Sequence, residues 1–244
     1  MSKRWKLRPK RREVLLGATA LSIGVFVTLL GINVASRLES GAVPLSPGSG
    51  EAEGRLTTPW LPDTVKRWRP KIEKYAAEYH IDPNLVAIIM TVESGGDPHA
   101  SSGVAKGLMQ ITDPTAGDIA HRIVKDKRDK YDLYDPDTSI EFGAAYLRYL
   151  TNELGELPQG PSWDETVRLV AASYNGGFAA ARAYRLHGWQ GLTDYDTQTL
   201  NYVRYVHVMW DERHDPLSFA YRYWFDAANG KRLVDQAGKY TMPK

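Results

Sequence analysis

The sequence predicts a mainly α-helical protein that carries an N-terminal transmembrane helix. Apolar side chains recur three and four positions apart through residues 60–214, and no sustained two-residue alternation occurs there. A separate stretch, residues 14–36, contains no charged side chain and is long enough as a helix to cross a hydrocarbon core of about 30 Å. With 43% hydrophobic and 25% charged residues, the composition excludes a collagen-like or mainly disordered chain.

Basic residues are concentrated at the N-terminus. The formal net charge is only +2, yet residues 1–13 are rich in Lys and Arg, with Glu13 as their one acidic side chain. Because basic flanks stay in the cytoplasm, residues 1–13 are predicted to be a cytoplasmic tail and residues 14–36 a single-pass anchor in the inner (cytoplasmic) membrane, with all later residues on the periplasmic side. A basic peptide beside an apolar run differs from the basic stripe of a nucleic-acid-binding domain, so no nucleic-acid partner is expected.

A cleaved signal peptide is the alternative interpretation of the same stretch. Arg11 and Arg12 precede the apolar residues, as in a twin-arginine signal. However, the run exceeds the usual apolar core of a signal peptide, and the small residues of 40–42 follow two charged side chains. The uncleaved anchor is therefore favoured.

The rest of the chain divides into a linker, a domain and an extension. Residues 37–58 are predicted to be a flexible linker, since Gly, Ser and Pro dominate the middle of this segment. The folded domain is expected over residues 59–214, and residues 215–244 form a C-terminal extension of unknown role. Within the extension, the aromatic residues of 218–225 fit either a strand and turn or a short helix that packs on the domain.

Apolar stripes predict the helices of the domain, and local signals predict where helices begin. Asp82 and Pro83 have the pattern of an N-cap followed by proline at the first helical position. Residues 138–141 and 162–165 have capping-box spacing. In chain order, the stripes are Ile72/Tyr75/Ala76/Tyr79, Leu85/Ile88/Ile89/Val92, Ile140/Ala144/Leu147, Val167/Val170/Ala171/Tyr174 and Tyr202/Val203/Val206/Met209/Trp210.

The residue inventory restricts the possible chemistry. The chain has no cysteine, which excludes disulfides, thiolate nucleophiles, zinc–thiolate sites and iron–sulfur clusters. Its histidines show no metal-ligand spacing, and the sequence has no G-x-S-x-G motif or phosphate-binding loop. No metal or cofactor is therefore expected, and catalysis has to depend on carboxyl, hydroxyl and amide groups.

Glu93 is the most informative carboxyl group. It follows Ile89 by four positions and Val86 by seven, so it extends an apolar stripe to the end of its helix, where Gly95 and Gly96 follow. An apolar environment raises the pKa of a carboxyl group, which suits a general acid near neutral pH. A carboxyl group at a helix end beside a Gly-rich loop is predicted to overhang a cleft. The alternative is a helix-end glutamate that turns into solvent.

Four short motifs follow one another along the domain, together with a connecting segment from Tyr134 to Leu147. The motifs are Glu93-Ser94, Gly107-Leu108-Met109-Gln110, Ser173-Tyr174-Asn175-Gly176-Gly177 and Tyr202-Val203. In this order they resemble the soluble lytic transglycosylase (SLT) family of peptidoglycan lyases over roughly residues 68–212. The resemblance implies a goose-type lysozyme-like, mainly helical fold with a sugar-binding groove. It also implies cleavage of the bond between N-acetylmuramic acid (MurNAc) and N-acetylglucosamine (GlcNAc) in peptidoglycan glycan strands, with formation of a 1,6-anhydroMurNAc end.

The resemblance further implies roles for individual residues. Glu93 matches the catalytic acid and base, Ser101 a serine near the N-acetyl group, Gln110 a sugar-contacting glutamine, Tyr174 and Asn175 the lining of the catalytic subsite, and Tyr202 a tyrosine that positions the glutamate. Structural interpretations of these residues remain open from the sequence. Tyr174 and Tyr202 lie on apolar stripes and fit a core, Gln110 fits a loop cap, and Asn175 fits a helix-ending turn.

A single carboxyl group suffices for the reaction that the resemblance implies. The substrate's own C6 hydroxyl is the nucleophile, so proximity replaces the second carboxylate that hydrolases use. The chain departs from many relatives at residues 112–114, where Thr-Asp-Pro replaces a methionine and proline pattern. Asp113, together with Asp97 and Asp118, keeps a hydrolytic muramidase open as the alternative enzyme. A non-catalytic glycan-binding or scaffolding protein is the alternative from another class.

Overall fold

The structure, a computed structural model, describes residues 54–125, 131–155 and 162–226. The predicted cytoplasmic tail (1–13), transmembrane anchor (14–36) and most of the linker (37–58) lie outside these ranges, as do residues 227–244 of the extension. Among the helices within the described ranges, none is both long and apolar enough to cross a membrane.

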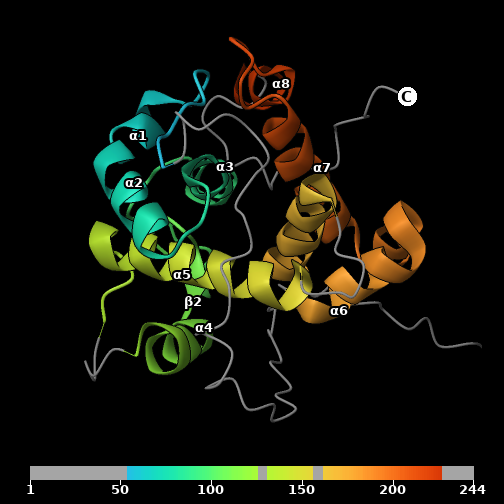
Figure 1. Ribbon diagram of the computed structural model, residues 1–244, viewed down its shortest axis with the longest axis horizontal. Coiled ribbons are helices and arrows are strands. Elements are labelled where there is room, and N and C mark those ends of the chain that lie inside the picture. Colours follow the sequence, from blue (N-terminus) through green and yellow to red (C-terminus); the bar gives the residue numbers. More distant parts are fainter. Residues whose placement is uncertain (1–53, 126–130, 156–161, 227–244) are drawn as a thin grey trace, which may run out of the picture.

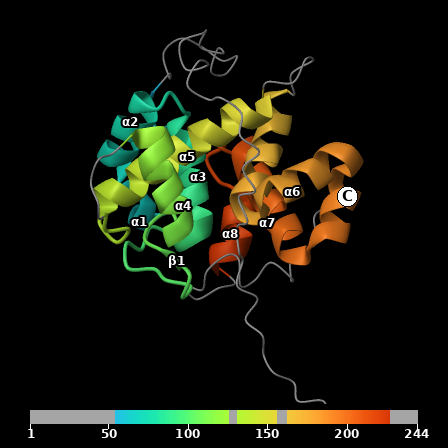
Figure 2. The ribbon, with the colours of Figure 1, turned by 90° about the horizontal axis from the view of Figure 1, so that it is seen from below.

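The described residues are mainly helical, as the apolar periodicity predicts (Figure 1). In chain order the helices are α1 (Asp63–Lys66), α2 (Arg69–Glu78), α3 (Pro83–Ser94), α4 (Asp113–Asp118), α5 (Pro136–Gly155), α6 (Trp163–Tyr195), α7 (Thr197–Asp211) and α8 (Phe219–Asp226). A π-helical turn, Ile119–Val124, continues α4. Helices α1 to α5 form one group, and α6 to α8 lie beside it (Figures 1 and 2).

Helix α3 is the central element of the fold. Its beginning is as predicted, because the Asp82 side chain accepts a hydrogen bond from the Asn84 N–H and Pro83 occupies the first turn. It ends where Gly95 adopts a left-handed conformation (φ 62°). Every residue of α3 is buried except Glu93, which is half-buried. A helix that is apolar on all sides belongs in a core, and α3 packs against α1, α2, α5 and α7.

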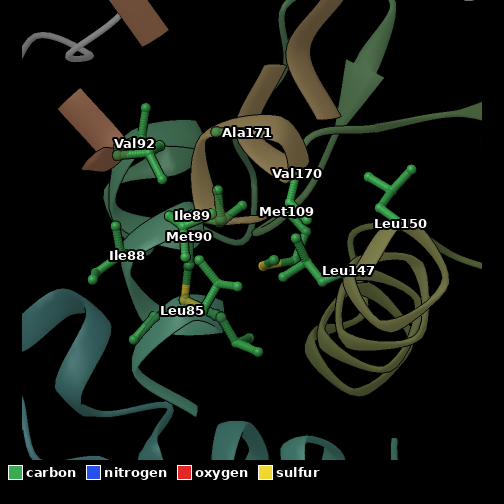
Figure 3. Close-up of a cluster of buried hydrophobic side chains, with 14 of the residues drawn as sticks. Leu85, Ile88, Ile89, Met90, Val92, Met109, Leu147, Leu150, Val170 and Ala171 are labelled. Atoms are coloured by element: carbon green, nitrogen blue, oxygen red, sulfur yellow. The ribbon is translucent and has the colours of Figure 1, made fainter. Parts of the chain in front are cut away.

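Figure 3 shows the core between α3, α5 and α6. Side chains of α3 point toward Met109, which in turn lies against Leu147 of α5 and Val170 of α6. All of these side chains are fully buried. Burying a side chain of this size contributes about 1.5 to 3 kcal/mol, so Met109 anchors its loop in the core.

The structure corrects one predicted helix start and adds a small sheet. Helix α5 begins at Pro136, because Asp135 caps it by accepting hydrogen bonds from the N–H and hydroxyl of Thr138 at 2.9 Å. The capping box predicted at residues 138–141 is therefore wrong, since Thr138 lies inside the first turn. Strands β1 (Ala105–Lys106) and β2 (Ile111–Thr112) pair antiparallel. Strands of this length are too short to produce a detectable alternation in the sequence.

The two ends of the described chain meet on one side of the fold. Leu56 and Thr58, within the segment predicted as linker, are buried, and the Asn84 Oδ1 accepts hydrogen bonds from the N–H groups of Thr57 and Thr58. The aromatic segment of the extension forms helix α8, which packs back on the body through a Trp60–Tyr221 ring contact at 5.5 Å. Of the two structures that fit this segment, the helix is the one formed.

Candidate active site

Glu93 lies on the last turn of α3 and is held by Tyr202 of α7. The Tyr202 hydroxyl donates a hydrogen bond to Glu93 Oε1 at 2.7 Å. Tyr202 is only 1% exposed, and burial together with the negative charge of Glu93 raises its pKa well above the usual value. The phenol therefore stays protonated at any physiological pH and remains a donor to the carboxylate.

Three helices hold the loop that follows Glu93. The Ser94 hydroxyl donates to the Leu108 carbonyl at 2.7 Å, and the Tyr174 hydroxyl of α6 donates to the Met109 carbonyl at 2.8 Å. The Met109 N–H donates to the Ser139 hydroxyl of α5 at 3.2 Å. Residues 107–110 are thus fixed relative to Glu93, since Ser94 is its direct neighbour in the chain.

The Tyr174 hydroxyl, which bonds this loop, has a raised pKa. Burial raises the pKa of Tyr174 well above its usual range, and the charges of Glu93 and Tyr146 act in the same direction. The hydroxyl is therefore a permanent donor to the Met109 carbonyl. The structure thus gives Tyr174 a loop-holding contact next to Glu93, in the position where the resemblance predicts a subsite residue.

The Gln110 side chain bonds two backbone carbonyls that precede it in the chain. Its backbone is left-handed (φ 47°), an uncommon conformation for a residue other than glycine. Its side-chain Nε2 donates to the carbonyls of Ala100 and Gly107, both at 2.9 Å. The loop-cap interpretation of Gln110 is therefore supported by its contacts, and a sugar contact stays a prediction.

Ser101 precedes the 107–110 loop in the chain, and Asn175 follows Tyr174 on α6. Ser101 is exposed, forms a bridge with Lys106 and accepts a hydrogen bond from the Gly103 N–H at 3.2 Å. Asn175 is half-buried on α6, and its Oδ1 lies 3.0 Å from the Thr199 hydroxyl at the start of α7. Both side chains stay predictions as substrate contacts.

Two residues that hold the site lie in a motif and in the connecting segment, and the sequence assigned neither of them a role. They are Ser94 and Ser139, both buried, whose hydroxyls bond the loop at Leu108 and Met109. Ser94 follows the glutamate directly, and Ser139 lies in the connecting segment. A serine on a buried helix face is the signal that indicates such a contact, because a buried hydroxyl needs a partner.

Asp97, Asp113 and Asp118 are the candidates for the second carboxyl group of a hydrolase. Each of them contacts a neighbouring residue instead. Asp113 forms an ion pair with Lys106 at 2.7 Å, Asp118 lies 3.4 Å from Arg122, and Asp97 accepts a hydrogen bond from the His99 N–H at 2.9 Å. These contacts account for the carboxylates as surface and turn residues. In the described part of the chain no group of three His, Asp or Glu side chains is arranged to hold a metal ion.

Comparison with known proteins agrees with this arrangement. The family profile "Transglycosylase SLT domain" matches residues 70–191. Membrane-bound lytic murein transglycosylase E of Buchnera aphidicola is 38% identical over 93 residues, which cover 37% of this chain and 42% of that protein. Endo-type membrane-bound lytic murein transglycosylase A of Klebsiella pneumoniae is 39% identical over 101 residues, which cover 38% of this chain and 50% of that protein. The chain thus spans about half the length of these curated relatives.

A solved structure shares the fold. The crystal structure of an inactive variant of the lytic transglycosylase Slt from Pseudomonas aeruginosa superimposes with a TM-score of 0.50 at 22% identity, covering 61% of this chain and 24% of that protein. The prediction of a mainly α, lysozyme-like fold is therefore confirmed for the part of the chain that the two structures share. Since the profile spans half of the sequence and includes α3, the loop after Glu93 and most of α6, the chain belongs to the transglycosylase SLT domain family.

Proposed function

We propose that this protein is a peptidoglycan lytic transglycosylase that cleaves the MurNAc–GlcNAc bond of glycan strands without water. The observation that carries the proposal is the Tyr202–Glu93 hydrogen bond, which orients a half-buried carboxyl group beside a loop held by three helices. The names of the relatives, lytic murein transglycosylases, support the same substrate class.

In the proposed mechanism Glu93 is both acid and base. The protonated carboxyl group gives its proton to the glycosidic oxygen, and the bond from that oxygen to C1 of MurNAc breaks. The C6 hydroxyl of the same MurNAc then attacks C1 and gives its proton to the Glu93 carboxylate. The carboxyl group is thereby restored, and a 1,6-anhydro ring has formed with no water consumed.

The other residues of the site bind or position in this proposal. Tyr202 fixes the direction of the Glu93 carboxyl group through Oε1. Tyr174 holds the backbone of the loop at Met109. Gln110, whose Nε2 is engaged with two backbone carbonyls, and the exposed Ser101 are proposed as sugar contacts. Asn175 lines the same subsite from α6. No cofactor or metal takes part in the proposed reaction.

A hydrolytic muramidase is less well supported. It requires a second carboxyl group, either as nucleophile or to activate water. Each candidate aspartate is engaged with a neighbour of its own, Asp113 with Lys106 and Asp118 with Arg122. A non-catalytic glycan-binding protein is also less well supported, since it does not explain why a carboxyl group is half-buried and oriented by a tyrosine.

The reaction products distinguish a lytic transglycosylase from a hydrolytic muramidase. Digestion of purified murein by the full-length chain is expected to release anhydro-muropeptides, because the C6 hydroxyl replaces water as nucleophile. Mass spectrometry should find each product lighter by one water than its hydrolytic counterpart. In water enriched in heavy oxygen, the products should carry no label. Labelled reducing ends would contradict the lyase and direct attention to Asp113.

We also propose that residues 14–36 anchor the protein in the inner membrane with the domain in the periplasm. The uncharged stretch and the basic flank before it support this topology, as do the names of the membrane-bound relatives.

Protease treatment of spheroplasts tests this topology. Protease added from outside is expected to remove the domain while a cytoplasmic control protein survives. A protected domain would contradict the orientation. A mature N-terminus near Val43 would instead indicate a cleaved signal peptide.

A further inference from the structure

The start of α7 holds residues 175 and 176 of α6. Thr199, in the first turn of α7, is 2% exposed, and its hydroxyl lies 3.0 Å from the end of the Asn175 amide. The Tyr195 hydroxyl, just before α7, donates a hydrogen bond to the Gly176 carbonyl at 2.8 Å. A Cβ at Gly176 would lie 2.9 Å from the Thr199 hydroxyl oxygen. The two helices therefore approach each other closely at this point.

One face of α7 reaches two residues of the candidate active site. Thr199 and Tyr202 are three positions apart, so their side chains lie on the same side of the helix. Tyr202 bonds Glu93, and Thr199 contacts Asn175. The helix that orients the candidate acid thus also contacts the asparagine that is proposed to line the catalytic subsite.

The Thr199 hydroxyl has a single proton and two neighbours that could accept it. Besides Asn175, it bonds Asp196 Oδ2. The Asp196 carboxyl group caps α7, since Oδ1 accepts the Gln198 N–H at 2.8 Å and Oδ2 accepts the Thr199 N–H at 3.1 Å. A carboxylate accepts hydrogen bonds and donates none, and it is a stronger acceptor than an amide. The Thr199 proton therefore belongs to the bond with Asp196.

This assignment determines how the Asn175 amide is oriented. Once its proton points to Asp196, Thr199 Oγ1 can only accept a hydrogen bond from Asn175, and only the NH2 end of the amide can donate one. In the structure the amide atom nearest Thr199 is Oδ1, which sets two lone pairs against each other. The two ends of an amide have the same shape and are distinguished by their hydrogen-bond partners. Turning the amide by 180° removes the conflict.

We propose that Thr199 is a positioning residue, which accepts a hydrogen bond from the Asn175 amide and thereby fixes the Asn175 carbonyl oxygen as an acceptor for the sugar. The proposal rests on the proposed function, in which Asn175 lines the catalytic subsite. The group of the glycan that this oxygen selects is a donor, either a hydroxyl or the N–H of an N-acetyl group. Without the Thr199 hydroxyl the amide turns freely, and the cost of ordering it lowers the affinity for glycan.

Glycan binding by full-length variants tests the proposal. Glu93→Gln, which is expected to bind without cleaving, serves as the parent protein, and calorimetry measures its affinity for a soluble murein tetrasaccharide. Adding Thr199→Val keeps the shape of the side chain but removes the hydroxyl. The affinity is expected to fall by about three- to tenfold, the usual effect of losing one hydrogen bond. Thr199→Ser keeps the hydroxyl and should retain the affinity of the parent. Thermal melts of all variants monitor folding.

A double-mutant cycle with Asn175→Ala separates positioning from a general effect on the fold. In the Asn175→Ala background, Thr199→Val should not lower the affinity further, because no amide is left to orient. Equal losses in both backgrounds would mean that Thr199 only supports the fold, which would overturn the proposal. Thr166→Val is the matched control. It removes another buried hydroxyl, which bonds the Ser162 carbonyl at 3.2 Å, and should leave the affinity unchanged.

Asn175→Asp tests the direction of the hydrogen bond without altering Thr199. The new carboxylate can accept but not donate, so the affinity is expected to fall at least as far as in Thr199→Val. Full affinity would mean that Thr199 donates to residue 175 and would overturn the assigned orientation. If the parent binds the tetrasaccharide and Thr199→Val binds it as tightly, the positioning role is wrong while the proposed function stands. If the unsubstituted chain cleaves no murein and the parent binds no glycan, the proposed function fails and this proposal fails with it.

Discussion

Glu93→Gln is expected to reduce murein cleavage by at least about 10² to 10⁴ fold, the usual contribution of general acid–base catalysis. The amide keeps the shape of the side chain and accepts the hydrogen bond from Tyr202, yet it cannot exchange a proton. Folding should be unharmed or slightly improved, because a half-buried ionisable group becomes neutral. Turbidity clearing of murein measures the activity, and thermal melts check the fold.

Matched variants show whether Glu93 acts alone. Asp97→Asn, Asp113→Asn and Asp118→Asn should each retain most of the activity, since no second carboxyl group is needed. Tyr202→Phe should cause an intermediate loss of about 10 to 100 fold, the usual effect of removing a hydrogen bond to a charged group. Near-normal activity in folded Glu93→Gln would refute the assignment. An equally deep loss in one aspartate variant would favour the two-carboxylate hydrolase.

Gly107→Ala is expected to destabilise the protein by about 3 to 5 kcal/mol and to disorder the loop next to Glu93. Gly107 has φ 73°, and a Cβ at this position would lie 1.8 Å from the Leu133 carbonyl oxygen and 2.9 Å from the Ser139 hydroxyl. A backbone carbonyl cannot rotate away as a flexible side chain does. The loop therefore has to move, which breaks the contact of Met109 with Ser139.

Gly103→Ala is the matched control for this prediction. Gly103 also has a left-handed backbone (φ 91°), but nothing lies within 4 Å of the Cβ position. The substitution should cost only about 1 to 2 kcal/mol, because it adds backbone strain without a collision. Urea unfolding of both full-length variants measures the difference. Equal destabilisation would mean that strain alone decides, and that the close approach of Leu133 to Gly107 does not matter.

Local signals in the sequence were sufficient to predict most of the helices. The cap at Asp82, the cap at Ser162, which accepts the Glu165 N–H at 3.3 Å, and the stop at Gly95 depend on atoms within four residues of one another. The apolar stripe of α3 likewise indicates a helix face that has to be buried. For α5 the spacing of residues 138–141 predicted the wrong cap, because Asp135 followed by Pro136 is an equally local signal and is the one that the helix uses.

The sequence also determined which residues are candidates for chemistry. The lack of cysteine and of metal-ligand spacing left carboxyl groups, and position on an apolar stripe separated Glu93 from the other acids. The order of the motifs indicated the family that the chain resembles. None of these observations placed one motif against another, because each concerns only its own stretch of chain.

Only the tertiary structure decided how the site is assembled. Tyr202 and Glu93 are 109 positions apart, and Ser139 and Met109 are 30 apart. Contacts at such separations depend on how α3, α5, α6 and α7 pack, and periodicity along a single helix contains no information about that. The same holds for the contact between the rings of Tyr149 on α5 and Phe178 on α6. The sequence by itself determined most of the helices and the candidate acid Glu93, while packing decided what surrounds them.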